Sequence, residues 1–143
     1  MKKMIVLLFA GVLACISLPS GAALSKSEVN QSEVKEKIEV YYFHFTRRCA
    51  TCQAVETESK SALEALYPSQ LKNGTISFKE VNLDNKNSKP AVEKAKAEGQ
   101  SLIILKGNKR VDLTTKAFMY ALSSPDKLQD EIKKAIDSML SAN

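Results

Sequence analysis

The pattern of hydrophobic and polar residues predicts alternating strands and helices. Residues 39–45, EVYYFHF, form a β-branched and aromatic run that is typical of a buried strand. Residues 49–66 carry apolar side chains at the spacing of one helical face, and Pro68 follows the expected end of this helix. A second strand is expected over residues 76–83, followed by a polar turn over 84–87.

The second half of the chain continues this alternation. Residues 88–97 predict a short helix, with Gly99 placed to cap it. The apolar run 102–105 predicts a strand, and residues 110–113 follow it as the other strand of a hairpin. A last helix begins at Ser124-Pro125, and one of its faces is apolar: Leu128, Ile132, Ala135, Ile136, Met139 and Leu140.

The order of these elements, β-α-β-α-β-β-α, predicts an α/β fold. A helix that connects two strands implies that those strands are parallel, and the hairpin adds an antiparallel edge. A mixed four-stranded sheet of this kind needs helices on both faces. We find no internal repeat.

The first residues have the pattern of an export signal, which we assign to residues 1–23. Lys2 and Lys3 precede an uncharged apolar run over residues 4–18, and small residues follow up to Ala23. The alternative interpretation is a permanent membrane anchor, but the apolar run is short for a helix that spans a membrane. We therefore expect an exported, periplasmic protein that is cleaved after Ala23.

Cys15 offers a different processing site. Residues 12–15, VLAC, match a lipobox, in which this cysteine would carry lipid and become the first residue. The apolar run continues over residues 16–18, where lipoproteins usually turn polar, so we favour removal of Cys15 with the signal. Attachment to a membrane is expected only in the lipoprotein alternative.

The remaining composition is that of one small globular domain. Residues 24–38 are polar and predict a tether or a partial first helix, and residues 39–143 form the domain, which we expect to be a monomer. The net charge of +5 includes Lys2 and Lys3, and the other basic residues alternate with acidic ones. This pattern lacks a basic stripe with interleaved aromatics, which argues against nucleic-acid binding.

Cys49 and Cys52 form the motif that carries chemistry. A C-x-x-C pair at the start of a helix can close a small disulfide ring, and the unpaired N–H groups there stabilise a thiolate on the first cysteine. The second cysteine lies about one turn into the helix and is sheltered. We therefore expect Cys49 to be the attacking thiolate at neutral pH and Cys52 to be the protonated resolving thiol.

Two structural alternatives compete with this redox interpretation. A purely structural disulfide across one helical turn closes a very small loop and stabilises little. A zinc site needs four ligands, and His44 is the one histidine of the sequence. We therefore predict no bound metal.

Three residues near the pair are candidates for supporting roles. Arg47 and Arg48 either stabilise the Cys49 thiolate and attract an acidic partner, or are solvated loop residues. A role for His44 in proton transfer is conceivable, but a hydrogen-bonded histidine in the core or at its rim is the better interpretation.

Residues 39–140 resemble the thioredoxin superfamily in element order and in the position of the C-x-x-C pair. The chain is also similar to a small exported family named as a subunit of a nitrophenyl-compound nitroreductase, which is encoded beside an efflux permease for aromatic arsenicals. This second similarity is carried by the segments YYFH at 41–44, TRRCATC at 46–52, GQSL at 99–102, DLT at 112–114 and AF at 117–118.

Three positions depart from thioredoxins. Phe43 takes the place of the buried acid that those proteins carry six residues before the first cysteine. Ala50-Thr51 replaces Gly-Pro between the cysteines. Gln100-Ser101 stands where a cis-proline faces the disulfide, and we assign Ser101 a supporting role there. These departures favour electron transfer to one specific partner over general protein reduction.

The sequence therefore predicts an exported thiol–disulfide oxidoreductase that acts on a redox partner protein. Nitroaromatic or arsenical reduction is the context that the resemblance implies. The chain has no flavin or nicotinamide fingerprint, so we expect no cofactor and assign any hydride chemistry to another subunit. The alternative function is a binding module that holds a soft metal or an arsenical through the same two cysteines.

Overall fold

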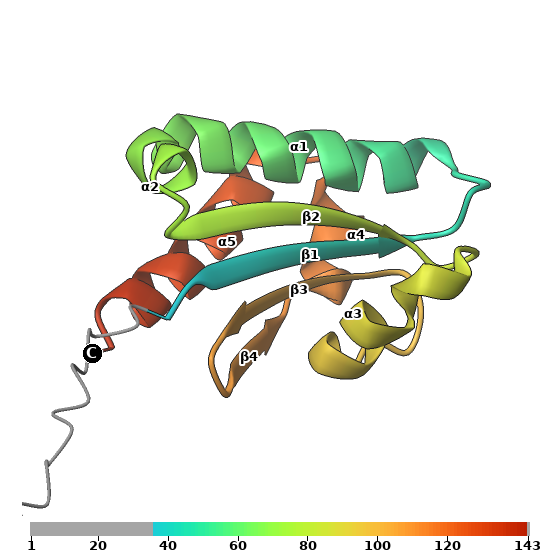
Figure 1. The fold of residues 1–143 in the computed structure, drawn as a ribbon. Helices are drawn as coiled ribbons and strands as arrows, with labels where there is room; N and C mark the ends of the chain where they lie inside the picture. The colour runs from blue at the N-terminus through green and yellow to red at the C-terminus, as the bar shows by residue number, and fades with distance from the viewer. Residues whose placement is uncertain (1–35, 143) are drawn as a thin grey trace, which may run out of the picture. The chain divides into compact units, whose positions relative to one another are not determined.

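The computed structural model describes residues 36–142, shown in Figure 1. The expected signal peptide, Cys15 and nearly all of the polar segment 24–38 lie outside these residues. The strands are β1 (Ile38–His44), β2 (Ile76–Asn82), β3 (Ser101–Lys106) and β4 (Lys109–Asp112). The helices are α1 (Ala50–Leu66), α2 (Pro68–Lys72), α3 (Lys89–Ala95), α4 (Thr114–Tyr120) and α5 (Pro125–Leu140), with a short 3₁₀ helix η1 (Lys86–Ser88).

The four strands form one mixed sheet in the order β2-β1-β3-β4. Strand β1 pairs with β2 in parallel and with β3 in antiparallel register, and β3 pairs with β4 as a hairpin. The crossover through α1 and the antiparallel edge were both predicted from the element order. The structure thus confirms an α/β, thioredoxin-like architecture in which β1 is a central strand.

Side chains of β1 alternate between two hydrophobic layers. Ile38, Val40 and Tyr42 belong to the larger core, which includes residues of α1, α4 and α5. Tyr41 and Phe43 belong to a smaller core with Ala95 of α3. Helices therefore cover both faces, as Figure 1 shows, and burial on both sides explains why β1 is almost continuously apolar.

The sequence did not predict α2 or α4. Pro68 is the first residue of α2, where proline is tolerated because its missing N–H would be unpaired anyway. Helix α4 buries only one of its seven residues, Ala117, so its hydrophobic signal is weak. Its start is fixed instead by a hydrogen bond of 2.9 Å from the Thr114 backbone N–H to the side-chain Oδ1 of Asp112.

Two predicted boundaries and one predicted capping hydrogen bond were wrong. Helix α3 ends at Ala95, and Lys96, with a left-handed φ of 51°, is its C-cap in place of Gly99. Strand β1 ends at His44, so Phe45 lies outside it with 42% of its surface exposed. Ser124 is at the N-cap position of α5, but its side chain makes no capping hydrogen bond.

Glu39 links β1 to two neighbouring elements, and this produces a testable pH dependence. Its carboxylate forms ion pairs with Lys79 of β2 at 2.6 Å and with Lys94 of α3. Burial raises the pKa of Glu39, but the hydrogen bonds and charges of both lysines outweigh burial and lower it from 4.5 to about 2. The ionised carboxylate therefore stabilises the folded chain.

We expect Glu39→Gln to lower the free energy of unfolding at pH 7 by about 1–2 kcal/mol, because both lysines are partly exposed and solvent screens the pairs. The difference from the wild type should shrink as the pH falls from about 4.5 to about 2, where the carboxyl becomes protonated in both states. Denaturant titrations at several pH values measure this. Glu64→Gln, at an exposed position of α1, is the control, and a pH-independent difference would contradict the assignment.

Candidate functional site

The two cysteines lie at the beginning of α1, directly after the loop that follows β1. Cys49 is the N-cap residue, and its sulfur accepts a hydrogen bond of 3.2 Å from the backbone N–H of Cys52. The pair forms a disulfide, with the Cα atoms 5.1 Å apart. Cys49 thus lies where the unpaired N–H groups and the positive end of the helix dipole favour a thiolate.

The two cysteines differ in access to solvent. Cys49 is exposed, whereas only 3% of the surface of Cys52 is exposed, and its Sγ lies near Gln100. Cys49 is therefore the more accessible end of the disulfide. This asymmetry is the one predicted from the spacing of the two residues.

Tyr42 lies beneath Cys52. Its hydroxyl donates a hydrogen bond of 2.7 Å to the backbone oxygen of Cys52, and its ring is fully buried. Burial raises the pKa of Tyr42 to about 12, so the hydroxyl stays a donor at neutral pH. Phe43, in contrast, faces α3 in the smaller core.

Tyr42 and Phe43 face opposite sides of β1 because successive strand residues point to opposite faces. Tyr42, which pairs with Glu80 of β2, contacts the helix that carries the disulfide. Phe43, which lies six residues before Cys49, packs in the smaller core instead.

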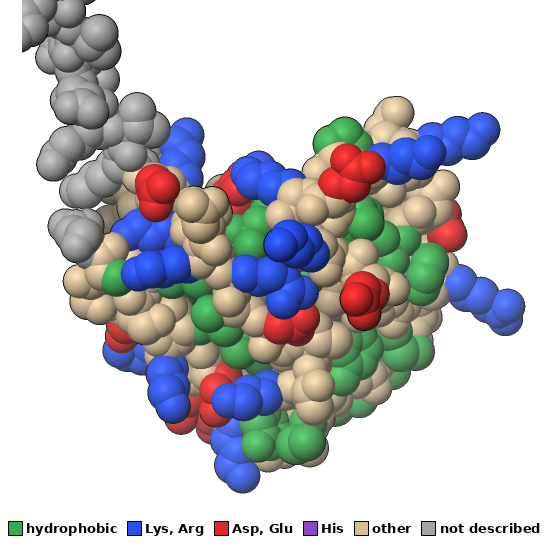
Figure 2. Space-filling model, turned by 90° about the horizontal axis from the view of Figure 1, so that it is seen from below, with side chains coloured by type: hydrophobic (Ala, Val, Ile, Leu, Met, Phe, Trp, Pro, Cys, Tyr) green, Lys and Arg blue, Asp and Glu red, His purple; other side chains and the backbone are tan. Residues whose placement is uncertain are grey.

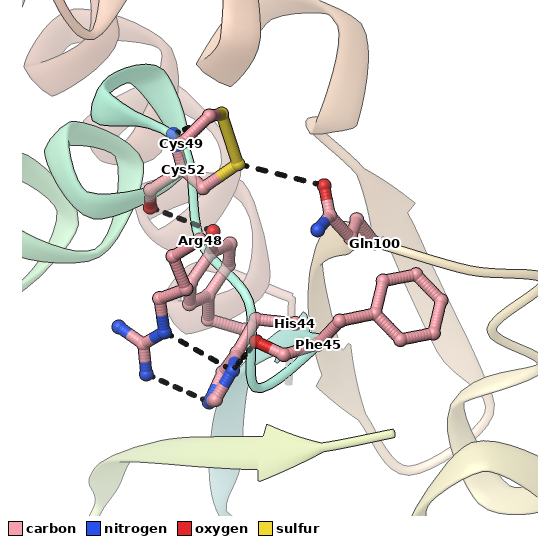
Figure 3. Close-up of a disulfide and its surroundings, with 7 residues drawn as sticks. His44, Phe45, Arg48, Cys49, Cys52 and Gln100 are labelled. Carbon is pink, nitrogen blue, oxygen red and sulfur yellow. Dashed lines mark hydrogen bonds between the residues drawn. A yellow bond between two sulfur atoms is a disulfide. The ribbon is translucent and has the colours of Figure 1, made fainter. Parts of the chain in front are cut away.

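Arg48 is held by a network of charged and polar groups, part of which Figure 3 shows. Its guanidinium forms an ion pair with Glu56 of α1, and Nη2 lies 2.9 Å from Nε2 of His44. Lys60 also contacts Glu56, at 2.7 Å, and forms an ion pair with Glu80 of β2. The network ties the loop before Cys49 to α1 and to the sheet.

His44 is a buried, hydrogen-bonded residue, as the sequence interpretation favoured. Its Nδ1 lies 2.9 Å from the backbone oxygen of Phe45 and 3.2 Å from Nε of Arg48, so the tautomer decides whether this nitrogen donates to the oxygen or accepts from the arginine. Nε2 lies 2.9 Å from Nη2 of Arg48. Both ring nitrogens of His44 thus face the Arg48 guanidinium and orient it.

The two arginines therefore have different surroundings. The carboxylate of Glu56 neutralises Arg48 locally; burial raises the pKa of Glu56, but hydrogen bonds from Lys60 and Arg48 lower it overall. Arg47 is exposed and makes no ion pair within residues 36–142. Of the two, Arg47 is the better candidate for an uncompensated charge near Cys49.

We expect Arg48→Met to lower the free energy of unfolding by about 1–2 kcal/mol, because it leaves a partly buried carboxylate and an imidazole without a donor. The matched variant Arg47→Met should change this free energy by no more than about 0.5 kcal/mol. Denaturant unfolding of both variants measures the difference. Equal effects would show that the Arg48 network contributes nothing to stability.

The segment between α3 and β3 brings Gln100 to the disulfide. Gln100 Oε1 lies 3.7 Å from Cys52 Sγ. Ser101, the supporting residue proposed from the sequence, is buried, and its hydroxyl donates to the backbone oxygen of Gly99 at 3.0 Å. Ser101 therefore fixes the backbone of this segment, while Gln100 contacts the sulfur. The sequence comparison identified the pair Gln100-Ser101 but assigned the supporting role to Ser101.

A cleft of about 650 Å³ begins beside this segment and extends over β3 and β4. It lies on the α3 side of the sheet, the side seen in Figure 2, where lysines and arginines stand beside acidic residues. Its lining includes Gln100, Ser101, Lys96, Glu98, Arg110 and Asp112. Gln100 thus borders the cleft and also contacts the buried sulfur.

No helix within residues 36–142 is both long enough and apolar enough to cross a membrane. Within the same residues, no three His, Cys, Asp or Glu side chains gather closely enough to bind a metal ion.

Comparisons with known proteins give few relatives. No family model matches the chain, and no curated protein matches it. A solved structure described as a malarial protein is similar, with 23% identity, a TM-score of 0.42, and coverage of 68% of this chain and 96% of that one. The germline-specific thioredoxin Deadhead of Drosophila melanogaster is similar at 22% identity and a TM-score of 0.44, covering 69% and 81%. The fold assignment therefore rests on the strand order and helix positions described above.

Proposed function

We propose that this chain is a thiol–disulfide oxidoreductase in which Cys49 is the attacking cysteine and Cys52 the resolving one. The observation that supports this most strongly is the unequal exposure of the two cysteines of one disulfide at a helix N-terminus. A structural disulfide needs no such difference, whereas exchange requires one sulfur that partners reach and another that they do not.

The exchange proceeds in two steps. A thiolate of the partner attacks Cys49 Sγ, the S–S bond to Cys52 breaks, and the electron pair leaves on the Cys52 sulfur, which takes up a proton. The second thiolate of the partner then attacks the mixed disulfide and releases Cys49 as a thiolate. The partner dithiol is oxidised to a disulfide and this chain gains two electrons; the reverse sequence oxidises the chain.

The pattern of residues 1–23 supports export to the periplasm, where disulfide exchange is common. The family resemblance of the C-x-x-C segment supports a single redox partner in nitroaromatic or arsenical reduction. Protein sequencing should find the mature N-terminus within a few residues of Leu24, and a diacylglyceryl group on Cys15 would identify the lipoprotein instead.

The alternative is a module that binds a soft metal or an arsenical. His44 is engaged by Arg48 and by Phe45, so such an ion would be held by the two sulfurs of Cys49 and Cys52. The alternative and the main proposal therefore use the same residues but differ in what those residues do.

One experiment separates the two functions. The purified, air-oxidised protein is mixed with a small dithiol, and alkylation with mass spectrometry follows Cys49 and Cys52 individually. The oxidoreductase proposal expects both cysteines to become free and to reoxidise with an added disulfide. The reduced protein is titrated in parallel with trivalent arsenic and with Cu(I). Tight stoichiometric binding without disulfide exchange would favour the binding module.

A further inference from the structure

We propose that Gln100 is a positioning residue for the sulfur of Cys52, which its side-chain amide hydrogen-bonds when the disulfide opens. This inference rests on the proposed oxidoreductase function. It assigns a role at the resolving cysteine to a residue that lies 48 positions away in the sequence.

The geometry places one polar group against a sulfur that has little access to water. Cys52 is 3% exposed, and Gln100 Oε1 is 3.7 Å from its Sγ, within the range of hydrogen bonds to sulfur. Figure 3 shows the Gln100 side chain extending toward the disulfide from the opposite side of the site. A buried thiolate without a donor is costly, so a neighbouring amide has a large effect there.

The backbone around Gln100 is fixed on both sides, which aims the side chain. The buried Ser101 hydroxyl donates to the Gly99 oxygen at 3.0 Å. The Leu102 N–H donates to the Thr114 hydroxyl at 3.1 Å, and Ser101 pairs with Phe43 in the sheet. Gln100 therefore approaches the sulfur from a rigid segment and not from a free loop.

An amide suits both states of the opened sulfur. In the disulfide, Cys52 has no proton and makes only a van der Waals contact with Oε1. When a thiolate attacks Cys49, Cys52 leaves as an anion, and a half-turn of the amide presents Nε2–H to it. After Cys52 is protonated, its S–H donates to Oε1. A leucine can neither donate a hydrogen bond to the thiolate nor accept one from the S–H. A carboxylate can only accept from the S–H.

The test measures two quantities for each variant: the equilibrium constant for reduction by a small dithiol, and the rate of exchange. We expect Gln100→Leu to lower both by about fivefold, the effect of one ordinary hydrogen bond, which corresponds to about 20 mV for a two-electron couple. Gln53→Leu, an exposed glutamine on α1 beside Cys52, is the matched control and should behave as the wild type.

Gln100→Glu separates hydrogen bonding from shape, because the two side chains have nearly the same size. Its carboxylate can accept the Cys52 S–H but cannot donate to the thiolate. In the reduced protein with Cys49→Ser, thiolate absorbance should therefore show that Cys52 ionises at a higher pH in Gln100→Glu than with Gln100 present. A purely structural role predicts the same pH profile for both.

The outcomes distinguish this inference from the proposed function. If the wild type exchanges and Gln100→Leu stays within twofold of it in both quantities, the role of Gln100 is wrong while the oxidoreductase stands. An unchanged pH profile in Gln100→Glu would likewise overturn the role. If the wild type shows no exchange, both proposals fail.

Discussion

Replacing Cys49 by serine is expected to reduce thiol–disulfide exchange to the background rate. A serine hydroxyl does not attack disulfides at neutral pH and cannot be part of a disulfide bond. No mixed disulfide with a partner can therefore form at position 49. The remaining Cys52 is 3% exposed and is not reached by an external disulfide. Exchange of a small disulfide, followed by mass spectrometry, measures the loss.

The matched variant Cys52→Ser should behave differently. It retains the exposed Cys49 but lacks the thiol that releases the partner, so a stable mixed disulfide on Cys49 should accumulate. Equal rates of mixed-disulfide formation in the two single variants would contradict the assignment of separate roles. Substantial exchange in Cys49→Ser would make Cys52 the attacking residue.

The second large effect concerns the core beneath α1. Leu128 of α5 is fully buried in the larger hydrophobic core, to which α1 and the sheet also contribute. Leu128→Ala removes most of its side chain and leaves a cavity, and we expect the free energy of unfolding to fall by about 2–5 kcal/mol. Chemical denaturation of the oxidised protein measures this change.

Leu122→Ala is the control for this prediction. Leu122 follows α4, and 60% of its surface is exposed, so the same substitution removes little buried area there. We expect a change of no more than about 0.5 kcal/mol. A loss at Leu122 as large as the loss at Leu128 would mean that the larger core is not packed as described.

The parts of the fold that were predicted correctly have strong periodic patterns. Strands β1 and β3 are buried on both faces and therefore read as apolar runs, and α5 has one clear apolar face. Helix α4 buries one residue and the five-residue α2 buries none, so no periodicity marked them. The left-handed C-cap at Lys96 was missed because glycine is the usual residue in that conformation.

Only those features of the candidate site that depend on residues close together in the sequence were predicted. The Cys49–Cys52 pair and the shelter of Cys52 follow from positions three apart on one helix. The partners of Arg48 and the contact of Gln100 with Cys52 join segments distant in sequence, and these depend on how helices and strands pack. Tyr42 contacts α1 and Phe43 does not, because alternate side chains of a strand face opposite sides of the sheet.

The most direct measurement is the redox equilibrium of the Cys49–Cys52 pair in the purified protein against buffers of defined dithiol-to-disulfide ratio. We expect one reversible two-electron transition above about −300 mV, in the range of exchange proteins. This transition should be lost in Cys49→Ser. A pair that stays oxidised below about −300 mV, as structural disulfides do, would contradict the account.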